Sequence, residues 1–189
     1  MGFDSILEKR HCTRHFKEKA VSWKDLAKIL DSVRFAPCAG GIPTVHIVVI
    51  DDKKIIPKIA DACLGQTFIS QAPYVIVICS DMDQIQRSYG KRADMYAKQQ
   101  AGASIENIFL KTTELGLSTC WIGAFDENPI KRVLDIPDKV NVEAVMPIGY
   151  EMGKEKPKEK IVLRRIVRFN NWKTKYEKFW PSSTATSNE

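Results

Sequence analysis

The chain has 189 residues, of which 44% are apolar and 28% charged, and its formal net charge is +6. This length suits one domain with a sizeable core, and a content of 10 Gly and 9 Pro excludes collagen-like, low-complexity and wholly disordered classes. No apolar run approaches the roughly 20 residues of a membrane helix, and the first residues lack the apolar core of a signal peptide. We therefore expect a soluble cytoplasmic protein without a membrane segment.

The N-terminal part predicts two short helices and a glycine-containing loop. Asp4 is a candidate N-cap for a first helix that runs to about Cys12. Ser22, with Asp25 three residues later, opens a second helix. Residues 36–43 place two glycines between two prolines, so they cannot continue that helix, and they allow close backbone approach to another group.

The rest of the chain alternates strands with helices. Apolar, β-branched runs predict strands at 45–50, 74–79, 119–122 and 142–148, the first of them inside the sheet. Helices are expected at about 55–64 and 128–134, and a long helical stretch without proline covers about 84–115. This long helix is unlike a repeated βαβ unit. We predict an α+β domain of three layers, with a central mixed sheet flanked by helices.

Five well-separated cysteines, with no Cys-x-x-Cys pair, favour reduced thiols over a disulfide framework or a structural zinc site. Cys38 lies in the glycine-containing loop, and His46 follows eight residues later. A nucleophilic thiol needs an adjacent base, whereas a strand can direct His46 away. Cys38 is thus either a nucleophile or, the reading we favour, a small residue in a tight loop.

Arg10 and Arg14 are separated by four residues, so on a helical turn they would project together and could hold a phosphate and a second electron-rich group. A solvated basic face is the alternative. His11 and His15 share this spacing and resemble a metal pair, but the flanking arginines would repel a cation, and we predict no metal site.

Two further features concern ligands. The strand predicted to end at Gly123 and Ala124 would release backbone N–H groups toward a planar ligand; a plain strand end is the alternative. Residues 154–178 carry ten Lys or Arg against three Glu, interleaved with aromatics. Such a segment can bind nucleic acid, or it can pack its aromatics on a partner subunit, which we favour.

Four segments, taken in order, resemble the FMN-dependent nitroreductase family. They are Arg-His-Cys-Thr-Arg-His-Phe at 10–16, Ala-Pro-Cys-Ala-Gly at 36–40, the stretch 116–125, and Met-Pro-Ile-Gly-Tyr at 146–150. With Gln66 they extend the resemblance from residue 5 to about 172. We therefore expect a nitroreductase-like domain at 1–172, followed at 173–189 by a basic, aromatic arm with a disordered end.

The resemblance implies a homodimer with FMN at the subunit interface and a long helix, here about 93–115, in the dimer core. It implies hydride transfer from NAD(P)H through the flavin to an electron-poor acceptor, such as a nitroaromatic or a quinone, by a ping-pong mechanism. No side chain is then catalytic, because the flavin carries the chemistry. The alternative is a flavin-binding relative with another reaction or without NAD(P)H reductase activity.

The resemblance also implies residue roles. Arg10 and Lys160, with Lys158 as alternate, would hold the FMN phosphate, and Arg14 would lie at the pyrimidine edge. Residues 37–40 would line the cofactor from the other subunit, and the backbone of residues 123–124 would meet the flavin near N5. The implied cofactor set is Arg10, His11, Cys12, Arg14, Pro37, Cys38, Ala39, Gly40, Gln66, Gly123, Ala124, Lys158 and Lys160, and the implied substrate set is Tyr89, Arg92 and Tyr96.

This sequence departs from the family pattern at two places. Cys12 stands where the family usually has Ser, which weakens one hydroxyl contact to phosphate. Gly41 replaces a common Asn, and the residues at 43–45 replace a common Gln-Pro-Trp, so a polar contact to the flavin ring is altered.

Overall fold

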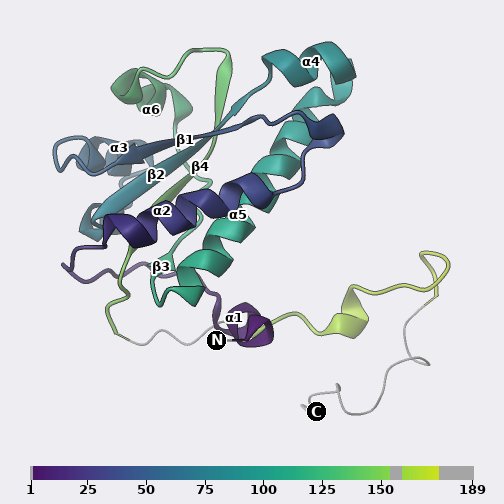
Figure 1. The fold of residues 1–189 in the computed structure, drawn as a ribbon, viewed down its shortest axis with the longest axis horizontal. Helices are drawn as coiled ribbons and strands as arrows, with labels where there is room; N and C mark the ends of the chain where they lie inside the picture. The colour runs from purple at the N-terminus through teal and green to yellow at the C-terminus, as the bar shows by residue number, and fades with distance from the viewer. Residues whose placement is uncertain (1, 154–158, 175–189) are drawn as a thin grey trace. The chain divides into compact units, whose positions relative to one another are not determined.

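A four-stranded sheet and six α-helices make up the described part of the chain, which in this computed structural model comprises residues 2–153 and 159–174. The chain divides into two units, residues 1–157 and 158–189. The elements of the first unit, in chain order, are α1 (Phe3–Lys9), α2 (Trp23–Asp31), β1 (Val45–Ile50), α3 (Ile56–Ala62), β2 (Tyr74–Asp81), α4 (Asp83–Tyr89), α5 (Ala93–Glu114), β3 (Ser118–Thr119), α6 (Glu127–Leu134) and β4 (Val140–Gly149) (Figure 1).

The sheet has the strand order β1-β2-β4-β3, and each neighbouring pair is antiparallel. Among the described strands β1 is therefore at an edge, and the prediction that it lies inside the sheet is wrong. Its continuous apolar run has another cause, because helices cover both faces of the strand. Val49 packs into the cluster on one face, and Ile50 belongs to the cluster on the other.

The third predicted strand is shorter than expected. β3 covers only Ser118–Thr119, and Ile122 contacts β4 again through an isolated antiparallel bridge to Val145. The backbone between them leaves the ladder. Within the described residues, the parallel pairing expected of a mixed sheet is confined to one bridge, between Cys12 and Thr119.

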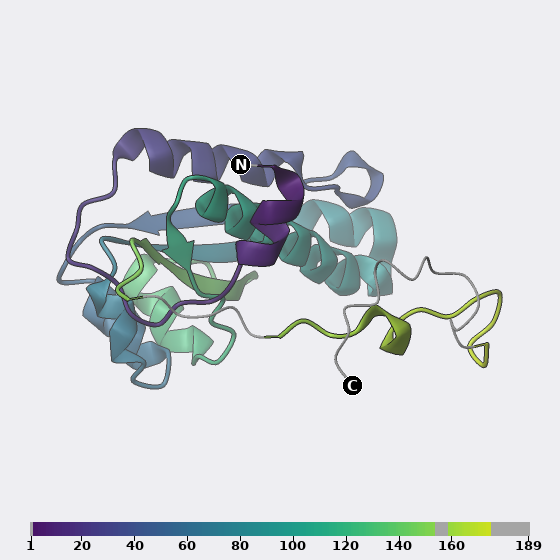
Figure 2. The same cartoon turned by 90° about the horizontal axis from the view of Figure 1, so that it is seen from below.

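Helices α2 and α5 cover one face of the sheet (Figures 1 and 2). Ser22 caps α2 as predicted, because its Oγ accepts the Asp25 N–H at 3.1 Å. In α5, small and aliphatic side chains at helical spacing are buried, as the sequence predicts: Ala97, Ala101, Ser104, Ile105, Ile108, Phe109 and Thr112. Small side chains let two helices and a sheet come close together, so α5 packs tightly on the strands.

Helices α3 and α6 cover the opposite face and complete the three predicted layers (Figure 2). Fully buried Ile59 of α3 and Ile130 of α6 belong to the same apolar cluster as the strand residues Val77 and Val145. Asp126 caps α6 by accepting the Asn128 N–H at 3.0 Å.

The proline-free stretch at about 84–115 contains two helices, and the longer one matches the helix expected at about 93–115. Helix α4 ends at Gly90, which has φ +52°, and α5 begins at Ala93 after one 3-10 turn. Helix α5 ends before Gly116, which has φ +69°, at the predicted C-cap signal. A positive φ favours glycine at both breaks, so the glycine positions set the length of α5.

The described part of the second unit contains one 3-10 turn at Leu163–Arg165 and a turn in which Asn171 Oδ1 accepts the N–H of Thr174 at 3.1 Å. Several of its apolar side chains are exposed within this chain, with Trp172 at 85%. None of the described helices is both long and apolar enough to cross a membrane.

Candidate functional site

The segment after α1 is extended. Helix α1 ends at Lys9, Cys12 forms a parallel bridge with Thr119, and the Thr13 N–H donates to the Thr119 carbonyl at 3.1 Å. The prediction that the first helix reaches Cys12 is therefore wrong. The physical reason is that β3 offers backbone partners along its free edge, which an extended segment can use and a helix cannot.

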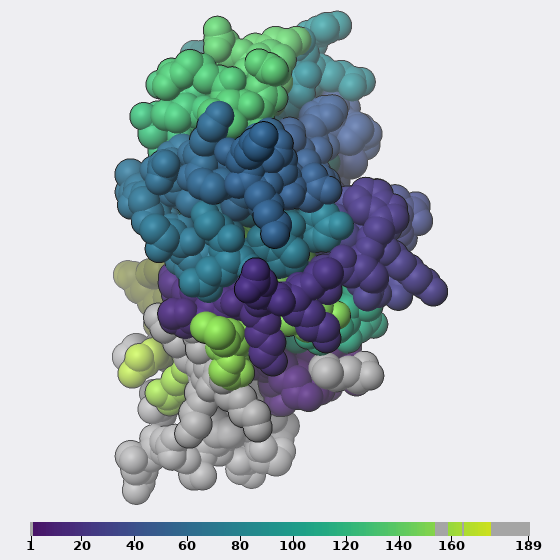
Figure 3. Space-filling view, turned by 90° about the vertical axis from the view of Figure 1, so that its left-hand side faces the viewer, coloured from purple at the N-terminus to yellow at the C-terminus, as the bar shows by residue number. Residues whose placement is uncertain are grey.

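The same segment then runs beside the chain that follows β4. Phe16 bridges Glu151 antiparallel, and the Lys17 N–H donates to the Tyr150 carbonyl at 2.8 Å. Figure 3 shows this N-terminal segment in purple, with green residues near position 150 at the same surface. Backbone hydrogen bonds thus fix the segment at both of its ends.

Side chains alternate along an extended segment, so Arg10, Cys12 and Arg14 fall on one side. In the structure Thr13 is fully buried and Arg14 is exposed, but His15 is also exposed and Phe16 is buried, so the alternation does not continue past Arg14. Helix α1 ends before Arg10, and the helical pairing expected for the two arginines is therefore wrong. The same correction applies to the helical pairing of His11 with His15.

Arg10 lies between α1 and α5. Its Nε is 3.5 Å from Glu106 Oε1, and its guanidinium carbon is 5.2 Å from the centre of the Phe109 ring. About a quarter of the Arg10 side chain is exposed. The arginine is therefore held by a carboxylate and an aromatic face of one helix while still reaching the surface.

Cys12 lies in surroundings that stabilise an anion. Its thiol is hydrogen-bonded to that of Cys120, and the Trp121 backbone N–H also bonds to it. The hydrogen bond from Cys120 lowers the pKa of Cys12 most. Burial raises this pKa, whereas the Trp121 N–H and the charges of Arg10 and Arg14 lower it further. Together they lower the pKa of Cys12 to about 5.

His11 ties the segment to the chain after β4. Its Nδ1 is 2.7 Å from the Lys9 carbonyl oxygen and its Nε2 is 3.1 Å from Glu151 Oε1. Each ring nitrogen therefore faces one oxygen of a different part of the chain. His11 therefore orients the backbone on which Arg10 and Cys12 lie.

The chain after β3 brings predicted residues together. Gly123 and Ala124 are exposed, and no described backbone carbonyl accepts the N–H of either. Gln66 Nε2 donates to the Cys63 carbonyl at 2.9 Å and to the Ala124 carbonyl at 3.4 Å. This edge therefore presents two N–H groups, with the Gln66 amide beside them.

A second group of predicted residues gathers where the 36–43 loop meets α4. Gly40 has φ +60°, and a Cβ added there would lie 2.4 Å from Tyr89 Oη. The Tyr89 ring packs edge-on against Tyr96 at 5.0 Å, and Arg92 lies over the Tyr96 ring at 5.5 Å. The loop is further fixed because Thr44, through its N–H and its hydroxyl, donates to Gln100 Oε1.

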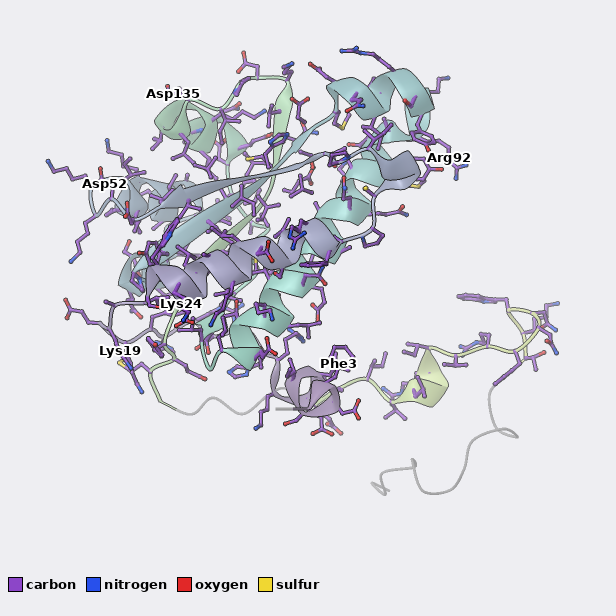
Figure 4. The ribbon with its side chains drawn as sticks, viewed as in Figure 1. Phe3, Lys19, Lys24, Asp52, Arg92 and Asp135 are labelled. Carbon is purple, nitrogen blue, oxygen red and sulfur yellow. The ribbon has the colours of Figure 1, made fainter. Side chains whose placement is uncertain are left out.

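The group around Gly40 and the group around Arg10 contact α5 at different positions along the helix. Tyr96 belongs to the loop group and Glu106 to the arginine group; they are ten residues apart, about 15 Å along a helix. Figure 4 labels Phe3 of α1 near one end of α5 and Arg92 at the other. Among the described residues of one chain, the Gly40 group and the Arg10 group therefore contact α5 at separate places.

The family that this arrangement belongs to follows from comparison with known proteins. The model of the Nitroreductase family matches residues 7–74 and 64–150, which is most of the chain. The chain is a member of the nitroreductase family.

Individual relatives agree with this assignment. A protein of Archaeoglobus fulgidus, named as a candidate NADH dehydrogenase/NAD(P)H nitroreductase, is 29% identical over 145 residues, which are 75% of this chain and 80% of that protein. An FMN reductase [NAD(P)H] of Bacillus subtilis is 24% identical over 78% of this chain and 65% of its own length. The solved structure of an FMN-dependent nitroreductase from Clostridium difficile is 28% identical, with a TM-score of 0.77 over 88% of this chain and 98% of that one.

The remaining predicted residues of this nitroreductase have no described contact with Arg10 or Cys12. Pro37 is exposed, whereas Cys38 and Ala39 are partly exposed. Among the described hydrogen bonds none joins Cys38 to His46, so the nucleophile reading of Cys38 gains no support. Lys158 lies outside the described residues, and Lys160 is an exposed residue of the second unit. Their role at the phosphate stays a prediction.

The sequence reasoning missed the residues that support the arginine segment. Glu106 and Phe109 hold Arg10, Glu151 holds His11, and Cys120 contacts Cys12. The helical periodicity of α5 could have indicated that Glu106 lies on the face opposite the buried alanines. The other partners lie far away along the chain, and no local pattern points to them.

Proposed function

We propose that this nitroreductase binds FMN and uses NAD(P)H to reduce an electron-poor acceptor, such as a nitroaromatic or a quinone, with ping-pong kinetics. When bound, FMN supplies the hydride chemistry. The protein supplies binding, orientation and charge. The observation that carries the proposal is the position of the Arg10 guanidinium, which Glu106 Oε1 at 3.5 Å and the Phe109 ring at 5.2 Å hold on the segment that also carries Cys12.

The same groups fit the phosphate of FMN. A field that stabilises a thiolate at Cys12 also stabilises a phosphate oxygen beside it, and the Arg10 guanidinium is already oriented by Glu106 and Phe109. Cys12 replaces the hydroxyl that the family usually has here.

The edge at Gly123 and Ala124 fits the flavin ring. Two exposed N–H groups can donate to ring acceptors, and small side chains leave room for a planar group. Arg14 is exposed on the same side of its segment as Arg10, and an extended segment separates the two by about 13 Å. Arg14 is therefore placed for a second point along an elongated ligand, where a positive charge stabilises negative charge on the reduced ring.

The separation of the two residue groups supports a homodimer in which each site is completed by the partner subunit. The Gly40 group lies about 15 Å along α5 from the Arg10 group, and in this proposal the Gly40 loop of one subunit lines the cofactor that Arg10 of the other subunit holds. Exposed apolar side chains of the second unit, with Trp172 at 85%, are suited to cover by another chain. Light scattering should give twice the chain mass of 21.4 kDa.

The decisive experiment is an absorption spectrum of the purified protein before and after anaerobic addition of NADH or NADPH. We expect a flavin spectrum that bleaches with at least one of them and recovers with a quinone or a nitroaromatic. Bound flavin that no nicotinamide bleaches would favour the relative with another reaction. A protein that stays colourless after incubation with FMN would contradict the whole proposal.

The phosphate role has its own test. Arg10→Ala should weaken FMN binding about tenfold to a hundredfold, because a charge-assisted hydrogen bond contributes about 1.5–3 kcal/mol. Arg34→Ala is the matched control: Arg34 also pairs with a carboxylate, Asp31 at 2.5 Å, and lies over an aromatic ring, Phe35 at 4.3 Å. Equal FMN affinity of the two variants, measured by fluorescence quenching, would show that Arg10 does not bind the phosphate.

A further inference from the structure

Two cysteines from distant parts of the chain meet at the edge of the sheet. Cys12 forms a parallel bridge with Thr119, Cys120 follows directly, and the two thiols are hydrogen-bonded. Bridged strands lie about 4.8 Å apart and one residue advances about 3.3 Å, which places the two α-carbons roughly 6 Å apart. This lies within the separation that a disulfide spans. Because β3 ends at Thr119, the Cys120 side chain is not held to the alternation of the strand.

The two sulfurs differ in the way that a reactive pair requires. Cys12 is partly exposed, and its anion is stabilised most by the Cys120 thiol and then by the Trp121 N–H and the nearby arginines. Cys120 is 1% exposed and follows Thr119, the residue that Cys12 bridges. An accessible thiolate can be attacked from solvent, and a buried neighbour can then close on it.

The remaining cysteines do not share these properties. Cys63 and Cys79 are buried, and burial raises the pKa of Cys63 to about 12 and, with the charges of Glu143 and Glu127, that of Cys79 to about 11. Both thiols therefore stay protonated and unreactive at neutral pH. Cys38 is partly exposed but belongs to the Gly40 loop.

We propose that Cys12 and Cys120 are a redox-active dithiol that a hydroperoxide oxidises to an intrachain disulfide. The Cys12 thiolate attacks one peroxide oxygen: an S–O bond forms, the O–O bond breaks, and the departing oxide takes a proton to leave as water or an alcohol. The Cys120 sulfur then attacks Cys12, the S–S bond forms, and the expelled hydroxide takes the Cys120 proton to become water. Two thiols lose two electrons, and one peroxide gains them.

The disulfide would change the edge on which it forms. It would link the N-terminal segment covalently to the chain after β3, and it would remove the negative charge that Arg10 and Arg14 face. The site is thus a thiol modification site in addition to the proposed flavin site. This thiol chemistry needs no flavin. Its test measures disulfides and free thiols, so the result does not depend on the proposed reductase activity.

The test treats the purified full chain with hydrogen peroxide, alkylates the remaining thiols, and maps disulfides by mass spectrometry without reduction. We expect one cross-link, between the peptides of Cys12 and Cys120, and a loss of two alkylatable thiols per chain. In Cys120→Ser, oxidation should stop at a Cys12 sulfenic acid that dimedone traps. Cys38→Ser should form the same cross-link as the wild type.

A second measurement needs no disulfide to form. In the Cys38→Ser background, alkylation of Cys12 by iodoacetamide should change less than about twofold between pH 6 and 8, whereas a free cysteine peptide gains about tenfold per pH unit. The proposal is overturned if peroxide leaves the wild type with all its thiols, if the cross-link involves Cys38, or if Cys12 alkylation rises with pH as the peptide does.

Discussion

The contact between Gly40 and Tyr89 allows a prediction with a worked magnitude. Gly40 has φ +60°, where a side chain costs about 1–2 kcal/mol, and a Cβ there would lie 2.4 Å from Tyr89 Oη. Tyr89 would have to move and lose its edge-on contact with Tyr96, worth about 0.5–1.5 kcal/mol. Gly40→Ala should therefore lower the free energy of unfolding by about 2–3 kcal/mol, measured by urea unfolding followed by circular dichroism.

Two matched variants separate the causes. Gly41 has φ +72° with no atom within 4 Å of an added Cβ, so Gly41→Ala should show the backbone cost alone, about 1–2 kcal/mol. In a Tyr89→Phe background the nearest ring atom is Cζ at 3.3 Å, and Gly40→Ala should then cost about 1 kcal/mol less than in the wild type. An equal loss for Gly40→Ala and Gly41→Ala, with no coupling to Tyr89, would refute the predicted clash.

Three further predictions concern the core, a helix end and a partly exposed carboxylate. Ile105→Ala, at a fully buried position of α5, should destabilise the fold by about 2–5 kcal/mol in urea unfolding, and a loss under 1 kcal/mol would contradict its core position. Asp135 follows α6 with φ +52°, so Asp135→Gly should raise the free energy of unfolding by about 1 kcal/mol in urea unfolding; a decrease would argue against strain there. Burial raises the pKa of Glu127, but hydrogen bonds from Lys131 and the Val142 N–H outweigh burial, and the net pKa is lowered. The ionised Glu127 therefore stabilises the fold above the ordinary glutamate pKa, and this stabilisation is lost as the pH falls through the pKa of the folded state. Glu127→Gln should thus lose more stability relative to wild type at neutral pH than at acid pH, and a loss that did not vary with pH would contradict this.

The fold is predictable where local chemistry decides it. The Ser22 cap, the buried face of α5 and the strands β1, β2 and β4 follow from capping residues and apolar periodicity. The edge position of β1 does not follow, since an apolar run shows that both faces are covered and says nothing about how many strands flank it. The shortness of β3 also needs tertiary information, because it depends on where the chain leaves the β4 ladder.

The candidate site divides in the same way. Its glycines and arginines can be predicted from the sequence, because glycines between two prolines indicate a tight loop and two closely spaced arginines indicate an anion site. The partners that orient them do not: Cys120 meets Cys12 from more than a hundred residues away, and Glu151 meets His11 across a still longer stretch. A contact of this kind depends on strand pairing, and one sequence carries no local trace of it.

The spacing of Arg10 and Arg14 shows why an incorrect local prediction can still bring the right residues together. Residues four apart share a side both in a helix and in an extended strand, so their common orientation survives the correction. Their separation does not: it is about 6 Å on a helix and about 13 Å in the extended segment observed after Lys9. Two charges 6 Å apart hold one small anion between them. Two charges 13 Å apart hold two points of an elongated ligand, which is what a phosphate and a flavin ring at opposite ends of one cofactor require.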